Sequence, residues 1–206
     1  MSTQIITILD NERNVPIEAT IRDDLTPDQL IEAENEWRPA RAELMRRFKE
    51  KGIDQSDWPQ HWHWNWENKA SYLSMLACNT FGIFIEGKWQ GMLMATTVGH
   101  QSRLDPDKGK PLVYCEFIEC APWNLQAILM KLGENARFRG IGPRLFEAAV
   151  YLSLDQGFHG RLGLHSLPQS QTFYRGLGMT DLGPDPKLNY FEMTRTQASA
   201  FQKGGG

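Results

Sequence analysis

The stretch that decides the fold is Arg137-Phe138-Arg139-Gly140-Ile141-Gly142-Pro143-Arg144-Leu145. It leads into an apolar-periodic helix that we expect from Pro143 to about Gln156. Proline is tolerated in the first turn of a helix, where its missing N–H is not needed. Unpaired amides at such a helix start attract anions, and Gly140 and Gly142 remove side chains that would block a phosphate. The stretch therefore predicts a phosphate-binding loop.

Two nucleotide-binding motifs are excluded by the residues that follow these glycines. The dinucleotide motif G-x-G-x-x-G needs a third glycine where Leu145 stands, and the P-loop needs a Gly-Lys-Ser/Thr sequence. The loop must therefore serve another phosphate-bearing ligand.

Upstream of the loop, residues 4–9 and 16–21 are rich in β-branched residues and predict an N-terminal strand or hairpin. Thr26 and Pro27 predict the start of a helix that ends at Gly52, and a second helical period covers residues 67–77. Residues 81–86, 91–98 and 112–120 predict an antiparallel meander whose first turn is residues 87–90. A short helix over residues 125–132 ends at Gly133.

Downstream of the loop, a strand is expected over residues 160–165 and a helix over residues 168–175. Two strands, over residues 179–182 and 188–194, complete the chain.

The composition of the 206-residue chain is that of a globular protein, with 41% hydrophobic residues and a net charge of −3. No stretch approaches the roughly 18 apolar residues of a membrane span. The N-terminus lacks the features of a signal peptide, and Cys78, Cys115 and Cys120 form no C-x-x-C pair. These features predict a cytoplasmic protein that does not bind membranes.

The pattern Arg137-x-x-Gly140-x-Gly142 resembles the pyrophosphate loop, Arg/Gln-x-x-Gly-x-Gly/Ala, of the GNAT family of acyl-CoA-dependent N-acyltransferases. The family's aromatic pair on the following helix is matched by Phe173-Tyr174. This resemblance covers residues 80–194. It implies an α+β fold with a mixed, mainly antiparallel sheet of six to seven strands, helices on both faces, and a splay at the cofactor site.

Two features depart from the family pattern. Residues 121–136 stand between the third strand of the meander and the loop, where the family has almost none, and we interpret them as an insertion. The family's asparagine beyond the fifth strand is replaced by the region around His165. We expect one domain over residues 1–202 and a flexible tail over residues 203–206.

The resemblance implies acetyl-CoA, or another acyl-CoA, as cosubstrate and direct attack of a primary amine on the thioester. Tyr174 matches the family's general acid. For the base, Glu119 is preferred over Glu116, which the strand period of two places on the opposite face, and His165 is the rival. The residues expected to bind the cofactor are Ile118, Cys120, Arg137, Phe138, Arg139, Gly140, Ile141, Gly142 and Arg144.

The acceptor site is expected to include Trp123, Asn124 and Trp64, the last from a tryptophan-rich segment over residues 58–66. The histidines of that segment have no further ligand at metal spacing, so no metal is expected. Basic residues between Arg38 and Lys51 predict a solvated helix face, with an acidic partner as the alternative.

Three functions remain open: an acyltransferase, a catalytically silent CoA-binding sensor or interaction module, and a nucleic-acid-binding protein. The net charge of −3 and the absence of a recognised module disfavour nucleic acid. The family often forms dimers, so a homodimer is a candidate assembly. The acceptor amine is not specified by the sequence.

Overall fold

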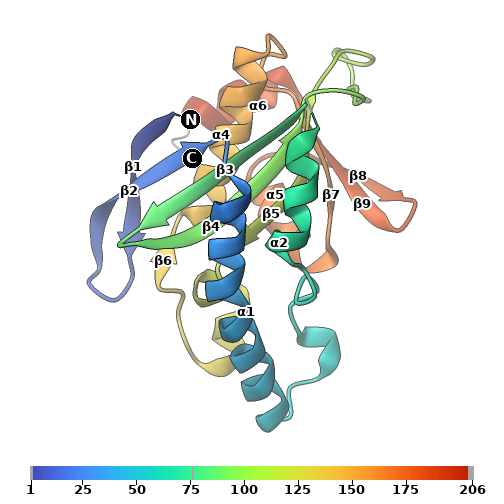
Figure 1. Cartoon of the computed structure of the whole chain (residues 1–206). Coiled ribbons are helices and arrows are strands. Elements are labelled where there is room, and N and C mark those ends of the chain that lie inside the picture. Colours follow the sequence, from blue (N-terminus) through green and yellow to red (C-terminus); the bar gives the residue numbers. More distant parts are fainter. Residues whose placement is uncertain (1, 76, 204–206) are drawn as a thin grey trace. The chain divides into compact units, whose positions relative to one another are not determined.

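The structure is a computed structural model that describes residues 2–75 and 77–203. Its strands join in one mixed sheet, in the order β6-β1-β2-β3-β4-β5-β7-β9-β8 (Figure 1). The predicted α+β class is confirmed, but the sheet has nine strands rather than six to seven. The N-terminal hairpin supplies two full strands, and β6 is a two-residue strand that forms by pairing with β1. The strands are β1 (Thr3–Asp10), β2 (Val15–Asp23), β3 (Cys78–Ile85), β4 (Lys88–Thr96), β5 (Val113–Cys120), β6 (Phe138–Arg139), β7 (Leu162–Ser166), β8 (Thr180–Asp185) and β9 (Leu188–Met193).

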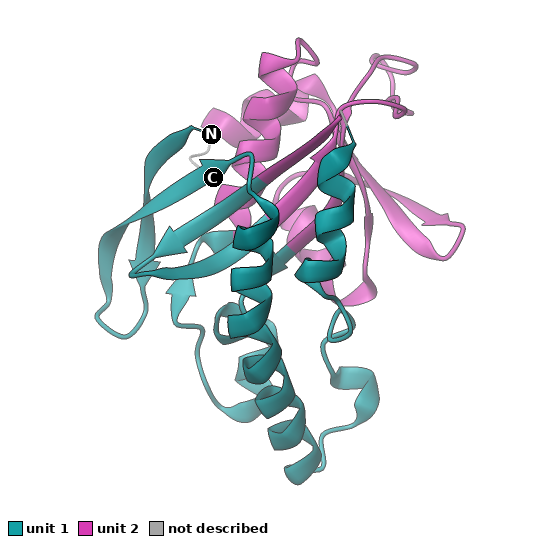
Figure 2. Cartoon of the chain, in the orientation of Figure 1, with its two compact units in different colours: residues 1–76, 81–92, 119–141 teal, residues 77–80, 93–118, 142–206 magenta. Residues whose placement is uncertain are grey.

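The described chain divides into two compact units (Figure 2). Unit 1 holds residues 2–75, 81–92 and 119–141, and unit 2 holds residues 77–80, 93–118 and 142–203. Strands β3, β4 and β5 contribute residues to both units. The expectation of one domain over residues 1–202 therefore stays a prediction.

Unit 1 is organised around the long helix α1 (Pro27–Glu50), whose start agrees with the sequence. Thr26 and Gln29 form a capping box, in which each side chain accepts a hydrogen bond from the other residue's backbone N–H. The buried side of α1 includes Leu30, Trp37 and Phe48, and the indole N–H of Trp37 donates to the carbonyl of Trp89 on β4. The helix is thereby fixed to the strands of its unit.

The turn between β3 and β4 is tighter than the predicted turn over residues 87–90. Glu86 and Gly87 both have positive φ, of 49° and 82°, so they are the two central residues of a hairpin turn and β4 begins at Lys88. Two consecutive residues with positive φ match the right-handed twist of the flanking strands, and this explains the shorter turn.

The second predicted helix, over residues 67–77, is also shorter in the structure. Helix α2 (Trp66–Lys69) continues as the 3₁₀ turn η2 (Ala70–Ser74). The hydroxyls of Ser71 and Ser74 donate to carbonyls three residues earlier, which accompanies the tighter winding. Residue 76, the penultimate residue of the predicted helix, lies outside the described residues.

Residues 121–136 form three short turns of helix: η3 (Pro122–Asn124), α3 (Gln126–Leu129) and η4 (Met130–Leu132). Gly133 ends them with a φ of 81°, as predicted. Their apolar residues pack with Leu44 and Phe48 from the C-terminal half of α1 in one buried cluster. The segment therefore covers an apolar stretch of α1 that would otherwise face water.

Unit 2 contains helix α4 (Ile141–Asp155) from its second residue onward, and the helices α5 (Gln171–Gly176) and α6 (Arg195–Lys203). A 3₁₀ turn, η5 (Pro168–Ser170), precedes α5, and another, η1 (Gln55–Asp57), lies in unit 1. Helix α6 is not predicted by our sequence analysis, although Thr194 and Gln197 form a capping box at its start. Lys203, expected in the tail, is the last residue of α6, and residues 204–206 lie outside the described part. The unit's fully buried core includes Leu112, Val113, Leu145, Phe146, Ala149, Leu162, Phe191 and Met193.

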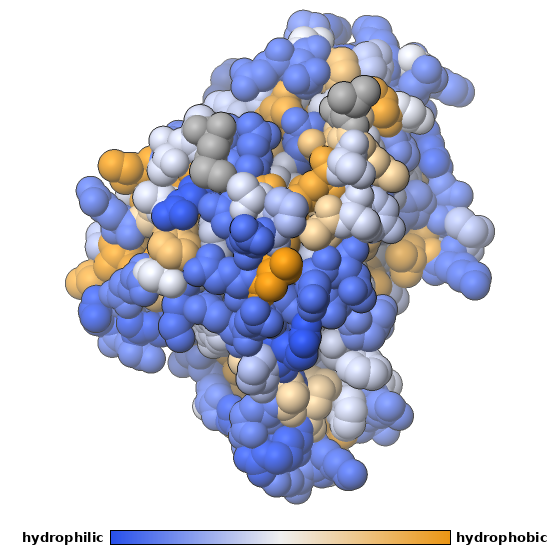
Figure 3. Space-filling view, in the orientation of Figure 1, coloured by the Kyte–Doolittle hydropathy of each residue, from blue (hydrophilic) through white to orange (hydrophobic). Residues whose placement is uncertain are grey.

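No helix among residues 2–75 and 77–203 is both long and apolar enough to cross a membrane. On the face shown in Figure 3, hydrophilic residues cover most of the surface and apolar residues form small separate groups.

Candidate functional site

The predicted phosphate loop is a sharp connection between β6 and α4. Gly140 separates the two elements and has a φ of 98°, a conformation that side-chain-bearing residues rarely adopt. Helix α4 begins at Ile141, two residues earlier than predicted, so Gly142 and Pro143 are its second and third residues. The backbone therefore presents a helix start directly after a glycine with left-handed geometry, as an anion-binding loop requires.

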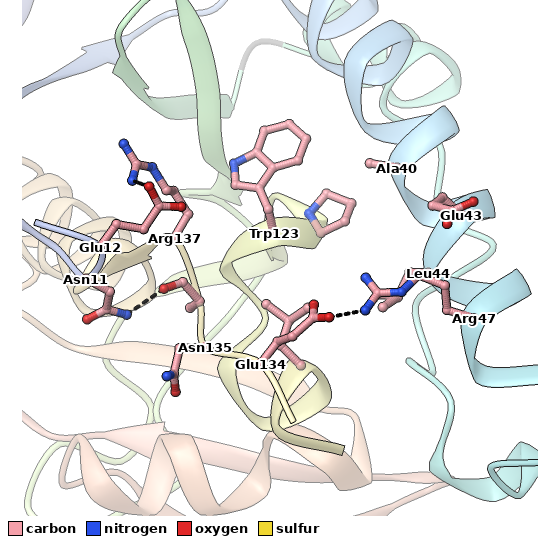
Figure 4. A pocket seen from close by; sticks show the side chains of 13 residues that line it. Asn11, Glu12, Ala40, Glu43, Leu44, Arg47, Trp123, Glu134, Asn135 and Arg137 are labelled. Carbon is pink, nitrogen blue, oxygen red and sulfur yellow. Dashed lines mark hydrogen bonds and ion pairs between the residues drawn. The ribbon is translucent and has the colours of Figure 1, made fainter. Parts of the chain in front are cut away.

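The side chain of Arg137 is occupied by partners within unit 1. Its guanidinium pairs with the buried Asp10, 3.2 Å from Oδ2, and with Glu12 (Figure 4). Burial alone would raise the pKa of Asp10, but the backbone N–H groups of Arg13 and Glu12 and the charge of Arg137 outweigh it, and the pKa is lowered. Asp10 is therefore ionised and holds Arg137, so contact of the Arg137 side chain with a cofactor stays a prediction.

The other loop residues differ in exposure. Phe138 and Ile141 are buried, whereas Arg139 is exposed. Arg144 is partly buried and pairs with Glu147 one turn later on α4, at 2.7 Å. Of these side chains, Arg139 is the one that the structure leaves at the surface for a ligand.

Trp123 and Asn124, both predicted at the acceptor site, converge on the buried side chain of Gln90. The Gln90 Oε1 accepts hydrogen bonds from Trp123 Nε1 at 2.7 Å and from Asn124 Nδ2 at 3.0 Å. Asn124 Oδ1 in turn accepts the backbone N–H of Phe138 at 3.0 Å. Asn124 thus connects β4 to the entrance of the phosphate loop, and its contact with an acceptor stays a prediction.

A pocket of about 550 Å³ in unit 1 brings Trp123 and Arg137 to one cavity (Figure 4). Arg47 from α1 and Glu134 from the segment after η4 form an ion pair in its wall. The remaining residues of the lining are Asn11, Glu12, Ala40, Glu43, Leu44, Pro122, Leu129, Asn135 and Ala136. The segment over residues 121–136 therefore shapes a cavity beside Arg137 that is lined by both apolar and charged residues.

Glu119, the preferred base, is buried in a polar cluster of unit 1. Its Oε2 accepts the indole N–H of Trp66 at 2.7 Å, and its Oε1 accepts from Arg41 at 3.1 Å. Arg41 also pairs with Glu34, so one guanidinium lies between two buried carboxylates. Burial raises the pKa of Glu119 to about 7, although Arg41 and Trp66 oppose the shift. Its carboxylate is thus poised to exchange a proton near neutral pH.

Arg41 is buried, so its predicted place on a solvated helix face is wrong. It is 7% exposed, because it lies on the same side of α1 as Glu34 and Trp37. Charged residues that recur within an apolar stripe at helical spacing are the signal that could have identified the pair Glu34 and Arg41 from the sequence.

The tryptophan-rich segment borders this cluster with aromatic rings and two further titratable groups. The ammonium of Lys69 lies 4.9 Å from the centre of the Trp64 ring. Burial lowers the pKa of Lys69 to about 8, while Glu119 acts against the shift. His61 Nε2 lies 3.8 Å from Glu119 Oε1, and burial, aided by Arg41, lowers the pKa of His61 to about 4. Trp64 therefore lies beside a buried ammonium.

Tyr174 and His165, the other predicted catalytic residues, lie in unit 2. Tyr174 on α5 is 8% exposed, and its ring packs with those of Phe146, Phe173 and Phe191. His165 on β7 contacts Tyr114 and Asp185, which the sequence analysis did not select.

The strand β5 parts from β7 within unit 2. Their parallel pairing joins Val113 to Leu162 and Tyr114 to Gly163, and in the described chain it extends no further. The pairing therefore ends four residues before Ile118, in agreement with the expected splay. Burial raises the pKa of Cys120, the last residue of β5, to about 12.

Among the described residues, no group of three or more His, Cys, Asp or Glu side chains could hold a metal ion. No family profile and no curated protein matches the chain.

Solved structures resemble the chain at low sequence identity. The PaiA N-acetyltransferase from Thermoplasma acidophilum, solved in complex with coenzyme A, is 14% identical. Its TM-score is 0.55, and the similarity covers 86% of this chain and 99% of that one. The BH1408 protein from Bacillus halodurans, solved as a tetramutant, is 16% identical with a TM-score of 0.50, over 80% of this chain and 96% of that one. The chain therefore has the fold of the PaiA N-acetyltransferase, in agreement with the fold that the resemblance of its loop and aromatic motifs predicted.

Proposed function

We propose that the protein transfers an acetyl or other short acyl group from acyl-CoA to a primary amine in a ternary complex. The observation that carries this proposal is the Gly140 connection at the start of α4, set in an N-acetyltransferase fold. A glycine-flanked helix start is a binding site for a phosphate group, and coenzyme A is the phosphate-bearing ligand of the PaiA structure.

The reaction needs no covalent enzyme intermediate. The amine nitrogen attacks the thioester carbonyl, the carbon–sulfur bond breaks, the amine loses a proton and the CoA thiolate takes one up. Burial raises the pKa of Cys78, and it raises the pKa of both Cys115 and Cys120 to about 12. These thiols are therefore poor nucleophiles at neutral pH. This supports direct attack.

The proposed roles follow from the chemistry of each group. Backbone N–H groups at the parting end of β5, near Ile118 and Cys120, would polarise the thioester carbonyl. Tyr174 would protonate the departing thiolate. The proton of the amine would pass to Glu119 or to His165, and the acceptor would contact Trp64, Trp123 or Asn124.

The pKa of Glu119 is about 7, but both of its oxygens already accept hydrogen bonds. Its side chain is 1% exposed, whereas that of His165 is 25% exposed. A base must come within hydrogen-bond reach of the proton that it removes. The exposure of the two side chains therefore favours His165 as the base.

Calorimetric titration of acetyl-CoA and of free CoA into the purified protein tests the cofactor. Gly142→Glu places bulk and negative charge at the helix start, and we expect it to abolish binding while the protein stays folded. Tyr151→Glu adds the same charge on the exposed side of α4, and it should bind as the unaltered protein does. Normal binding by Gly142→Glu would refute the phosphate loop.

The alternative function is a CoA-binding sensor or interaction module without turnover. Mass spectrometry of reactions with a panel of amines separates the two, because a module binds acetyl-CoA and never consumes it. A cytoplasmic location and a homodimer stay predictions.

A further inference from the structure

His165 lies between a hydroxyl and a carboxylate in unit 2. Tyr114 Oη is 2.6 Å from His165 Nδ1, and Asp185 Oδ2 is 3.4 Å from His165 Nε2. The three side chains come from β5, β7 and β8, so each is fixed by a separate strand. The imidazole therefore has one partner on each ring nitrogen.

The partners determine which nitrogen of His165 carries the proton. The hydrogen bond from Arg103 lowers the pKa of Asp185, so Asp185 is a carboxylate and accepts from Nε2–H. Burial raises the pKa of Tyr114 to about 12, so its hydroxyl keeps its proton and donates it to Nδ1. In this tautomer Nδ1 is the atom of the imidazole that can accept the phenolic proton.

Other charged or titratable groups surround this trio. His100 stacks on the Tyr114 ring with centroids 4.1 Å apart, and Arg103 lies over the ring of Tyr190 at 3.9 Å. Glu116, two residues along β5, is exposed and interacts electrostatically with both Tyr114 and His165. Tyr190 on β9 packs against His165, with centroids 5.1 Å apart.

The trio stands where β5 and β7 part. Tyr114 and Gly163 form the last paired row of the two strands, and His165 lies two residues further along β7. The side chains of His165 and Asp185 are 25% and 38% exposed. A solute can therefore approach the trio, in contrast to the buried carboxylate of Glu119.

We propose that Tyr114, His165 and Asp185 form a relay that removes the proton of the acceptor amine, with Tyr114 as the catalytic residue that contacts the amine. This inference rests on the proposed acyl transfer. The ammonium gives a proton to Tyr114 Oη while the phenolic proton moves to His165 Nδ1, and the freed amine attacks the thioester. Asp185 stabilises the resulting imidazolium, which later returns its proton to water.

Tyr114→Phe removes the hydroxyl and keeps the ring that stacks on His100. With acetyl-CoA and a reactive amine at pH 7, we expect kcat to fall about 100-fold, the scale of a lost general base. The variant can use only amine that is already neutral, a fraction that rises about tenfold for each pH unit below the amine pKa near 10. The deficit should therefore shrink steadily from pH 7 to pH 9.5, and the affinity for acetyl-CoA should not change.

Tyr190→Phe is the matched control, because it removes a neighbouring hydroxyl that is outside the relay. The ratio of its kcat to that of the unaltered protein should be constant across the same pH range. Asp185→Asn is a second test that leaves Tyr114 in place. Its kcat should fall less than that of Tyr114→Phe, and this loss of kcat should also shrink as the pH rises.

Two results would overturn the relay while acyl transfer stands. One is a Tyr114→Phe deficit that does not vary with pH, which indicates a structural role, and the other is unchanged turnover. Failure of the unaltered protein to consume acetyl-CoA with any amine would instead refute the proposed function, and the relay with it.

Discussion

The backbone N–H of Phe138 donates a 3.0 Å hydrogen bond to the side-chain oxygen of Asn124, so the entrance of the phosphate loop is held by a buried amide. The same side chain donates to both oxygens of Gln90, at 3.2 and 3.0 Å. Asn124 thus satisfies three groups at once, and its position determines where the loop begins.

Asn124→Ala should loosen this entrance. A buried N–H without a partner costs about 1–3 kcal/mol, so we expect a loss of stability of that size and weaker binding of acetyl-CoA. Urea unfolding and calorimetric titration measure the two effects. Asn135→Ala, at an exposed residue in the same segment, should change neither quantity, and equal behaviour of the two variants would contradict the role of Asn124.

Alanine at Gly140 and at Gly176 should have opposite effects on stability. Gly140 has a φ of 98°, so a side chain there is strained by about 1 kcal/mol or more, whereas Gly176 is helical and has open space around it. We therefore expect a lower melting temperature for Gly140→Ala and a slightly higher one for Gly176→Ala. Thermal melts of the two variants provide the comparison, and a stabilised Gly140→Ala would show that the turn is not strained.

Glu119 should make the protein less stable as the pH rises. The pKa of Glu119 is about 7 in the folded chain, and in the unfolded chain it has the ordinary value of 4.5. Between pH 4.5 and pH 7 the unfolded chain therefore releases this proton more readily than the folded chain does. The stabilisation is complete below about pH 4.5 and is lost as the pH approaches 7.

Urea unfolding of the unaltered protein and of Glu119→Gln at several pH values isolates this contribution as a difference. The subtraction matters because His61, whose pKa is lowered to about 4, adds stability as the pH rises toward 6.5. Glu67→Gln, at an exposed carboxylate on α2, serves as the matched control for the substitution itself. If the difference in unfolding free energy between the unaltered protein and Glu119→Gln does not vary with pH, the pKa of Glu119 is ordinary.

Gly163→Ala should introduce a steric conflict with Tyr190. A Cβ at residue 163 would collide with Tyr190 Oη, and overpacking of this kind costs about 1–3 kcal/mol. Removal of the hydroxyl in Tyr190→Phe should recover part of that loss in the double variant, since other atoms of Tyr190 and Leu112 remain close. Additive effects in this double-mutant cycle would mean that the two residues do not touch.

The elements that the sequence predicted well are those encoded by local signals. Thr26 and Pro27 marked the start of α1, and Gly133 marked the end of the short helical turns after β5. Helix α6 carried an equally local signal, the capping box of Thr194 and Gln197, so its omission was an error of interpretation.

The contacts of the candidate site depend on pairings that no local pattern contains. Arg41 reaches Glu119 across 78 residues of sequence, and Tyr114 reaches His165 across 51. Strand β6 has two residues and exists because Asp10 and Leu9 pair with it. For such features the sequence supplies candidates, and the tertiary structure determines their partners.

The segment after β5 is closed on itself by backbone hydrogen bonds at both ends. The N–H of Ala121 donates to the carbonyl of Gln90 at 2.9 Å, and the N–H of Arg137 donates to the carbonyl of Trp123 at 2.8 Å. Because its two ends are fixed near each other, changes in the length of the stretch between them have little effect on closure entropy. Residues 125–135 can thus vary in length while the phosphate loop keeps its place, provided that the apolar residues packed on Leu44 and Phe48 are retained.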